Sequence, residues 1–258
     1  MDHRPIGVFD SGMGGISVLA KAIEFLPRER FIYFGDNEYA PYGAKSNELI
    51  LKRSERIIER FIQQGCKAVV IACNTATSVA AAHLRTYSPI PIIGMEPALK
   101  PAAERHPEGT ITVLATAVTL RLQKFQRLMS RYGQHTVPIS CPCLVEYVEH
   151  GETDLSLVEN YLRQRLSICD PQAPSAIVLG CTHFYFVKAL IAQMYPQAEL
   201  IDGHEGTIQE LARRIELVQD NGLSSAQYEL TSSAEDPAVI ARMQRLLTLA
   251  LQHKDYYQ

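Results

Sequence analysis

The sequence of 258 residues lacks blocks of like charge and long apolar runs. Its formal net charge is only −3, which argues against nucleic acid or an anionic membrane as the main partner. No apolar run approaches the roughly 20 residues that are needed to span a bilayer. A strand-like segment begins by Ile6 without the charged and apolar regions of a signal peptide. We therefore expect a cytoplasmic protein with no membrane or nucleic-acid partner.

Sequence signatures of metal, disulfide and nucleotide sites are also missing. The six cysteines form no Cys-x-x-Cys pair, and Cys141-Pro142-Cys143 is too tight for the usual zinc spacing, so we expect no metal site. A chain of this size does not need a disulfide framework, and the cytosol keeps thiols reduced. The glycine-rich stretch near the N-terminus continues into neither Gly-Lys-Ser/Thr nor Gly-x-Gly-x-x-Gly, so nucleotide binding is weakly supported.

The chain does contain apolar, strand-like runs that end on cysteine. Hydrophobic residues make up 47% and charged residues 21% of the sequence, which is typical of a globular protein with a substantial core. Residues 68–72 are followed by Cys73, and residues 176–180 are followed by Cys181. Apolar runs without alternation are typical of parallel strands buried on both faces, and ligands bind at the carboxyl ends of such strands. We therefore expect the two thiols at strand ends in different halves of the molecule.

Strand-like and helix-like segments alternate along the whole sequence. This order predicts an α/β fold with two doubly wound parallel-sheet domains, related by pseudo-symmetry, and an active site in the cleft between them. We expect residues 1–97 and 208–258 in the first domain and residues 98–207 in the second. The expected strands are residues 5–9, 30–35, 68–72, 91–95, 110–115, 136–139, 176–180, 199–201 and 228–231. The main expected helices are residues 16–26, 47–64, 75–87, 120–132, 144–149, 154–168, 184–194, 207–217 and 237–252.

The segment Asp10-Ser11-Gly12-Met13-Gly14-Gly15 connects the first expected strand to the first helix. A glycine-rich turn before a helix has an anion-binding geometry, because free backbone N–H groups point toward the ligand. The charge of Asp10 would repel a phosphate, but it suits a substrate ammonium or the orientation of a thiol. The alternative is that Asp10 only caps the helix that follows.

The two cysteines both lie where a strand ends and a helix begins. A helix N-terminus lowers the pKa of a thiol, which predicts a thiolate that can act as a base or nucleophile near neutral pH. A single nucleophilic cysteine would need a histidine base, and His183 lies near Cys181, but nothing similar follows Cys73. Two equivalent thiols instead suit the inversion of a stereocentre, because one removes a proton and the other returns one on the opposite face.

Four motifs together resemble the bacterial glutamate racemases of the aspartate/glutamate racemase superfamily. They are the glycine-rich segment at residues 10–15, Pro41-Tyr42-Gly43, Ala72-Cys73-Asn74-Thr75 and Gly180-Cys181-Thr182-His183. The resemblance extends over nearly the whole chain, and the motifs come in the family order. It implies two α/β domains around a cleft, no cofactor, and interconversion of L- and D-glutamate for peptidoglycan synthesis.

The resemblance also implies roles for individual residues. Cys73 is expected to abstract the proton from D-glutamate and Cys181 from L-glutamate, with Asp10 beside the first thiol and His183 beside the second. Glu149 is expected near the substrate ammonium and the second thiol, and the alternative for this residue is a solvated carboxylate at a helix end. The expected substrate contacts are Asp10, Ser11, Pro41, Tyr42, Gly43, Asn74, Thr75, Thr116, Thr119, Thr182 and His183.

Two features depart from the family pattern, and other readings stay open. Phe184-Tyr185-Phe186 stands where the family commonly has Tyr-Pro, and Cys143 adds a thiol near the expected substrate loop. An aspartate or broad-specificity amino-acid racemase is the main alternative, and a small-molecule binding protein without turnover is a third possibility. A homodimer is possible. Activation by a cell-wall precursor is not expected, because the sequence begins close to its first strand.

Overall fold

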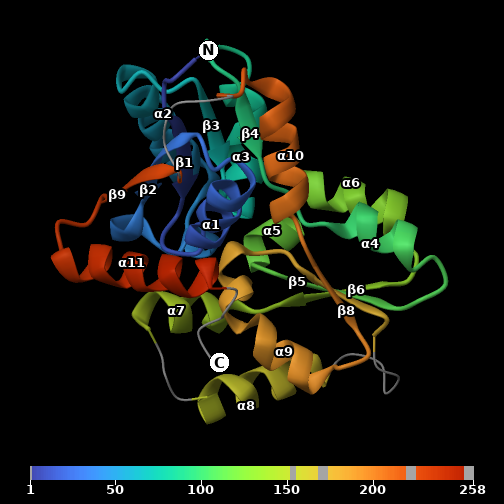
Figure 1. The fold of residues 1–258 in the computed structure, drawn as a ribbon. Coiled ribbons are helices and arrows are strands. Elements are labelled where there is room, and N and C mark those ends of the chain that lie inside the picture. The colour runs from blue at the N-terminus through green and yellow to red at the C-terminus, as the bar shows by residue number, and fades with distance from the viewer. Residues whose placement is uncertain (1, 152–154, 168–173, 219–224, 253–258) are drawn as a thin grey trace.

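The computed structural model describes residues 2–151, 155–167, 174–218 and 225–252, and its described strands form two parallel sheets (Figure 1). The strands are β1 (Ile6–Asp10), β2 (Arg30–Gly35), β3 (Ala68–Ile71), β4 (Ile92–Gly94), β5 (Ile111–Ala115), β6 (Thr136–Ser140), β7 (Ala176–Leu179), β8 (Glu199–Asp202) and β9 (Gln227–Ser232). The α-helices are α1 (Ile16–Phe25), α2 (Asn47–Gln63), α3 (Asn74–Leu84), α4 (Leu99–Arg105), α5 (Ala117–Arg121), α6 (Gln123–Tyr132), α7 (Pro142–His150), α8 (Leu155–Leu166), α9 (Lys188–Met194), α10 (His204–Arg214) and α11 (Pro237–Leu251). The 3₁₀ turns are η1 (Asn37–Tyr39), η2 (Tyr42–Ala44) and η3 (Thr182–Val187).

The two sheets have corresponding strand orders. The first runs β4-β3-β1-β2-β9, and the second, read from its other edge, runs β8-β7-β5-β6. In each sheet a central strand, β1 or β5, pairs in parallel with a thiol-bearing strand, β3 or β7. The predicted α/β class with two doubly wound parallel sheets related by pseudo-symmetry is confirmed. As predicted, the last strand, β9, returns to the first sheet, beside β2.

The central strands are buried because their sequences are apolar on both faces. Every residue of β1, β3, β5 and β7 is buried, whereas β9 at the edge of the first sheet begins with three exposed residues. This difference is expected, because helices cover both faces of a central parallel strand and an edge strand is partly open to solvent. In the described part of the chain, no helix is both long enough and apolar enough to cross a bilayer.

Several expected helices have different bounds in the structure. The helix expected at residues 207–217 is observed as α10, which begins and ends three residues earlier. The helix expected at residues 120–132 is split into α5 and α6 by Leu122, whose backbone is extended (φ −69°, ψ 141°). The helix expected at residues 75–87 runs from Asn74 and ends at Leu84. The helix expected at residues 154–168 is observed as α8, and both of its expected end residues lie outside the described residues, as does Cys169.

The helix expected at residues 184–194 is correct only in its second half, α9. Its first half belongs to the 3₁₀ turn η3, and Cys181 before it is extended (φ −146°, ψ 139°) with no capping side-chain bond. Five of the six residues of η3 are buried, including Phe184 and Phe186. Near-continuous burial of this kind does not produce the 3.6-residue periodicity by which a helix is predicted.

Helix α1 connects the two halves of the molecule. It covers the first sheet, and it also packs against η3, α10 and α11 (Figure 1). Its N-cap position is Gly15, and the Asp10 carboxylate accepts from the backbone N–H groups of Gly12 and Gly15 just before the helix. The start of α1 therefore brings the glycine-rich segment of the first half into contact with the thiol-bearing turn of the second half.

Candidate active site

The structure places both thiols at the carboxyl ends of buried strands. Cys73 follows β3 and Cys181 follows β7 by two residues each, and their exposed fractions are only 6% and 8%. Beside them, the neighbouring central strands β1 and β5 end at Asp10 and Ala115. The site is thus assembled from equivalent edges of the two sheets, as the pseudo-symmetry requires.

Cys73 is held as the N-cap of α3. Its Sγ accepts a hydrogen bond from Ala76 N at 3.4 Å and donates one to Ser11 Oγ at 3.5 Å. Burial, followed by the charge of Asp10, raises the pKa of Cys73 to about 12. The expected lowering of this pKa by the helix N-terminus is therefore wrong, because desolvation of the thiolate outweighs one backbone N–H donor. Cys73 is a neutral thiol near neutral pH.

Cys181 lies next to a hydrogen-bonded histidine and carboxylate. His183 Nδ1 is 3.6 Å from Cys181 Sγ, and His183 Nε2 is 2.6 Å from Glu149 Oε1. Burial by itself lowers the pKa of His183, but its bonds to Cys181 and Glu149 raise that pKa well above the ordinary value. The protonated ring can donate through Nδ1 to a thiolate, so the second thiol has a cationic partner that the first thiol lacks.

Glu149 is not a solvated helix-end carboxylate. Its side chain is only 11% exposed, and it accepts hydrogen bonds from Met13 N at 2.6 Å and from Asn37 Nδ2 at 3.1 Å. Burial opposes ionisation, but the bonds from His183, Met13 and Asn37 outweigh it and lower the pKa of Glu149. Gly12 is required here, because a Cβ at this position would overlap the Glu149 carboxylate.

Asp10 links the two halves of the site. Its carboxyl group is fully buried, accepts a hydrogen bond from Gly12 N at 3.0 Å, and accepts another from Thr182 Oγ1 at 3.2 Å. Burial raises the pKa of Asp10, and the charge of His183 partly offsets this effect. Asp10 therefore acts electrostatically on the Cys73 thiol and contacts the turn that carries Cys181.

Three threonine hydroxyls meet at one side of the site. The Oγ1 atoms of Thr75, Thr116 and Thr119 lie 3.0–3.2 Å from one another. The amide of Asn74 is also buried, and neither its nitrogen nor its oxygen has a hydrogen-bond partner among the described residues. Neutral donors gathered in this way can hold a carboxylate without a cationic side chain.

The turn at Pro41, Tyr42 and Gly43 packs against this threonine cluster. A Cβ on Gly43 would lie 3.2 Å from Thr116 Cβ, so the backbone of the turn approaches the second half of the molecule closely. The Tyr42 hydroxyl points elsewhere and donates to Asp36 Oδ2 at 2.6 Å. The turn thus presents its backbone to the site, and the tyrosine side chain anchors it.

Three side chains that support the site were missed by the sequence reasoning. Arg53 donates two hydrogen bonds to Asp36, of 2.9 and 2.6 Å, and so fixes the carboxylate that holds Tyr42. Tyr33 is fully buried and donates to Gly12 O at 2.6 Å, which fixes the glycine-rich segment. Asp36 directly follows strand β2, so its position at a strand end was a usable signal. Arg53 and Tyr33 gave no such signal, because each acts through a residue far away in the sequence.

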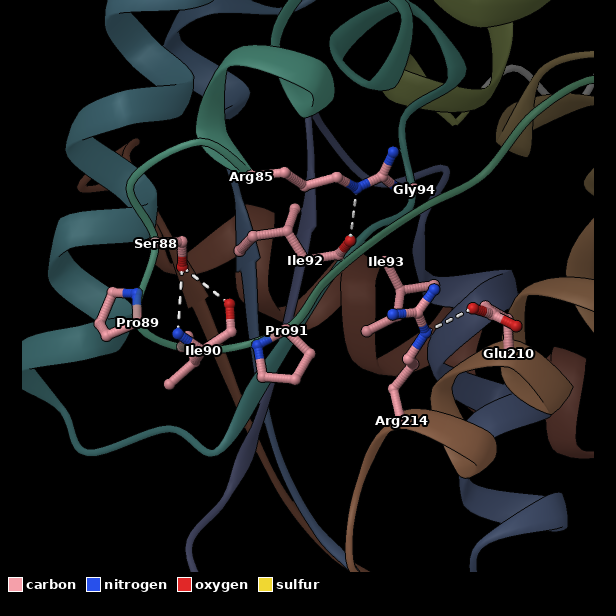
Figure 2. A pocket seen from close by; sticks show the side chains of 10 residues that line it. All are labelled: Arg85, Ser88, Pro89, Ile90, Pro91, Ile92, Ile93, Gly94, Glu210 and Arg214. Carbon is pink, nitrogen blue, oxygen red and sulfur yellow. Dashed lines mark hydrogen bonds and ion pairs between the residues drawn. The ribbon is translucent and has the colours of Figure 1, made fainter.

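Both thiols are buried, and the larger cavities are lined by other residues. A cavity of about 250 Å³ touches one side of the site and is lined by Asn37, Pro41 and Glu149 among others. A cavity of about 610 Å³ lies between residues 88–94 and α10 (Figure 2), and neither thiol is among the residues that line it. In that cavity Arg85 donates to the carbonyl of Ile92 at 2.9 Å. No group of metal-binding side chains occurs within the described ranges.

With a thiol at each of two equivalent strand ends, this protein is an isomerase of the amino-acid racemase class, as the matches described next show. The sequence model of the family described as Asp/Glu/Hydantoin racemase matches residues 13–211. The chain therefore belongs to the Asp/Glu/hydantoin racemase family.

Similar proteins agree with this family. The chain is 45% identical over 255 residues to a glutamate racemase of Clostridium perfringens strain 13, covering 96% of this chain and 98% of that protein. The glutamate racemase of Campylobacter jejuni subsp. jejuni has a similar structure (TM-score 0.83, 26% identity, 95% of this chain and 98% of that one). The Escherichia coli glutamate racemase, solved with L-glutamate and the activator UDP-MurNAc-ala, is also similar (TM-score 0.82, 29% identity, 96% and 95% of the two chains). The predicted resemblance to bacterial glutamate racemases is confirmed.

Proposed function

We propose that this protein is a glutamate racemase that interconverts L- and D-glutamate by proton transfer at Cα through two thiols. One observation carries the proposal. Cys73, whose pKa is raised to about 12, is a thiol, while Cys181 lies 3.6 Å from a histidine whose pKa is raised well above its usual value. A racemase that starts from L-glutamate needs this combination, because one group must accept a proton while the other supplies one.

In the direction from L- to D-glutamate, Cys181 acts as the base. The His183 imidazolium donates to the Cys181 thiolate and is itself held by Glu149. The thiolate takes the α-proton from L-glutamate, and the Cys73 thiol gives its proton to the opposite face of Cα. In the reverse direction the two thiols exchange roles, and Asp10 and Ser11 orient Cys73.

The substrate is held mainly by neutral donors and by carboxylates. Thr75, Thr116 and Thr119 exchange their mutual hydrogen bonds for bonds to one carboxylate of glutamate, and Asn74 supplies a further donor. Asp10 acts on Cys73 through its charge and accepts a hydrogen bond from Thr182 beside Cys181, so it is placed to hold the ammonium group. Fixed donors in a closed site stabilise the charge that develops on the carboxylate as the proton leaves, more strongly than water does.

The wider setting of the protein follows from this activity. D-Glutamate made by the enzyme supplies peptidoglycan synthesis in the cytoplasm, and the partner of the chain is its small-molecule substrate, in a possible homodimer. The domain division at residues 1–97 with 208–258, and 98–207, fits the strand orders of the two sheets. It leaves the catalytic contacts at the junction, where Thr182 donates to Asp10.

Separate replacement of each thiol tests the proposal. Cys73→Ala and Cys181→Ala should each abolish racemisation of both enantiomers, while the wild-type enzyme exchanges the α-proton of both with deuterated solvent. Cys66→Ala is the matched control, because this buried thiol lies outside the site. Racemisation that survives the loss of either site cysteine would refute the two-thiol mechanism. A panel of L-amino acids that includes aspartate tests the substrate, and faster turnover of aspartate would favour the alternative racemase.

A further inference from the structure

A buried histidine outside the proposed catalytic set connects the two halves of the molecule. His204 begins α10, and its exposed fraction is 5%. Its Nδ1 lies 2.6 Å from Asp202 Oδ1 at the end of β8, and its Nε2 lies 2.8 Å from Ser17 Oγ in α1. The three side chains thus form a continuous row of polar contacts, an ion pair and a hydrogen bond, from the second sheet to the helix that covers the first sheet.

Ser17 also contacts backbone carbonyls from both halves of the site. Its Oγ is 2.8 Å from Gly14 O in the glycine-rich segment, and 3.3 Å from Thr182 O in the turn after Cys181. Both of these carbonyls can only accept hydrogen bonds, and Ser17 has a single proton to donate. Ser17 can therefore serve the carbonyls only if His204 donates to its oxygen.

Asp202 lies against the other ring nitrogen of His204, so the ring can donate to Ser17 as well only when both of its nitrogens carry a proton. Burial by itself raises the pKa of Asp202, but the charge of His204 and its hydrogen bond outweigh burial and lower it. The carboxylate is therefore ionised; it lies 2.6 Å from Nδ1 and accepts a hydrogen bond from His204 N at 3.0 Å. An ionised carboxylate next to a ring nitrogen fixes the orientation of the imidazole, as it does when histidine binds a metal or acts in a catalytic triad.

We propose that His204, oriented by Asp202, is a positioning residue for Cys181. It holds Ser17 against the carbonyls of Gly14 and Thr182, and so fixes the turn that carries the second thiol relative to the glycine-rich segment. The contacts of Ser17 reach the Cys181 turn directly through Thr182 O, and they reach the Cys73 side only through the backbone of Gly14. The inference depends on the two-thiol function proposed above, and it predicts a defect mainly in proton transfer by Cys181.

Strand β8 itself supplies a matched control. At its other end Glu199 forms a similar pair with His106, whose Nε2 is 2.6 Å from Glu199 Oε2. The two pairs share their chemistry and their strand, but only the one at Asp202 is at the carboxyl end, where the site lies. A role in general stability would make the two pairs comparable, whereas a positioning role makes only His204 important for catalysis.

The experiment compares isotope effects in the two directions of the reaction. We expect His204→Ala to lower kcat about 10-fold, because small displacements of a reacting group are costly, with little change in KM. The primary isotope effect on kcat/KM should rise with α-deuterated L-glutamate, because abstraction by Cys181 becomes more rate-limiting. The same isotope effect should fall with α-deuterated D-glutamate, because proton abstraction by Cys73 becomes less rate-limiting.

Further variants separate positioning from folding. Ser17→Ala should show the same pair of shifts in isotope effect, and His204→Gln, which keeps an N–H donor near Ser17, should restore much of the activity. His106→Gln should leave both isotope effects unchanged. If His204→Ala is too unstable to assay, the isotope effects of Ser17→Ala are measured in its place.

Two results would overturn the inference. One is isotope effects that stay equal to those of the wild type in both His204→Ala and Ser17→Ala. The other is a His106→Gln variant whose two isotope effects shift in the way predicted for His204→Ala. Either result leaves the proposed function intact, since that function stands or falls with the Cys73→Ala and Cys181→Ala variants in the wild-type background.

Discussion

Glu149 and His183, which are 34 residues apart in the sequence, form a hydrogen-bonded pair of 2.6 Å in the interior of the site. Burial of an isolated charge is costly, but here the two charges neutralise each other. Hydrogen bonds from Met13 N and Asn37 Nδ2 satisfy the remaining acceptor sites of the carboxylate. The pair determines the protonation state of the ring that faces Cys181. Its consequences for catalysis and for stability can be measured separately.

Glu149→Gln keeps the shape of the side chain but removes its charge. The protonated form of His183 then loses one of the two partners that favour it, and Cys181 Sγ faces a weaker donor. We expect kcat to fall by about 10²-fold, the lower range of general acid–base contributions, in a circular-dichroism assay of racemisation. Glu146→Gln, an exposed neighbour on α7, is the control. Equal losses in the two variants would contradict the role of Glu149.

The pair should also give the protein a characteristic pH dependence of stability. The pKa of His183 is raised, so the protonated ring contributes stability that is complete below its ordinary pKa of 6.5 and is lost as pH rises through the raised value. The pKa of Glu149 is lowered, so its carboxylate contributes stability that is complete above its ordinary pKa of 4.5 and is lost as pH falls through the lowered value.

Urea unfolding of the wild type and of Glu149→Gln at a series of pH values measures this contribution. Between about pH 4.5 and 6.5 both partners are in their favoured forms, and we expect the variant to be less stable by about 1.5–3 kcal/mol. The difference should shrink on both sides of this window. A difference that stays constant from acid to alkaline pH would show that the pair does not have the assigned charges.

Gly14→Ala should disable the site without changing any ionisable group. A Cβ at Gly14 would lie 2.4 Å from both His183 Nδ1 and Thr182 Oγ1, so the second thiol turn must move away. We expect a loss of about 10²-fold or more in kcat/KM, because the reacting groups lose their alignment. Gly206→Ala is the control: a Cβ there meets nothing within 4 Å, and the change in a helix should be neutral or slightly stabilising. Wild-type activity in Gly14→Ala would contradict the close approach of the two halves.

Thr119→Val should weaken substrate binding by removing one of the three clustered hydroxyls. The lost donor affects the carboxylate in the ground state and the transition state alike, so KM should rise about 10-fold for both enantiomers while kcat changes little. Thr119→Ser keeps the hydroxyl and should behave almost as the wild type. Thr248→Val, on the exposed face of α11, serves as the control. An unchanged KM would show that the carboxylate binds elsewhere.

Much of the fold was predictable because its signals are local. The apolar runs before Cys73 and Cys181 are buried on both faces, and this burial appears directly as an unbroken series of apolar residues. Burial also explains why the first part of the helix expected at residues 184–194 was wrong. In η3 nearly every side chain is buried, so the sequence there has no periodicity that separates a 3₁₀ turn from a helix.

The candidate site was predictable as a set of residues but not as a set of charges. Glu149 had a solvated helix end as an equal alternative, because nothing near it in the sequence shows that Met13 N and His183 are its partners. The pKa of Cys73 was expected to fall and instead rises to about 12, because burial is a property of the assembled protein. Tyr33 and Arg53 were missed, since both act across long sequence separations.

By itself, the sequence determined the order of strands and helices and placed a thiol at the end of one strand in each half. Those features follow from the polarity of neighbouring residues, which a linear reading contains. Only the tertiary structure decided which thiol faces a histidine, which carboxylate meets that histidine, and which hydroxyls cluster. These properties depend on desolvation and on contacts between the two halves, and both arise only when the chain has folded.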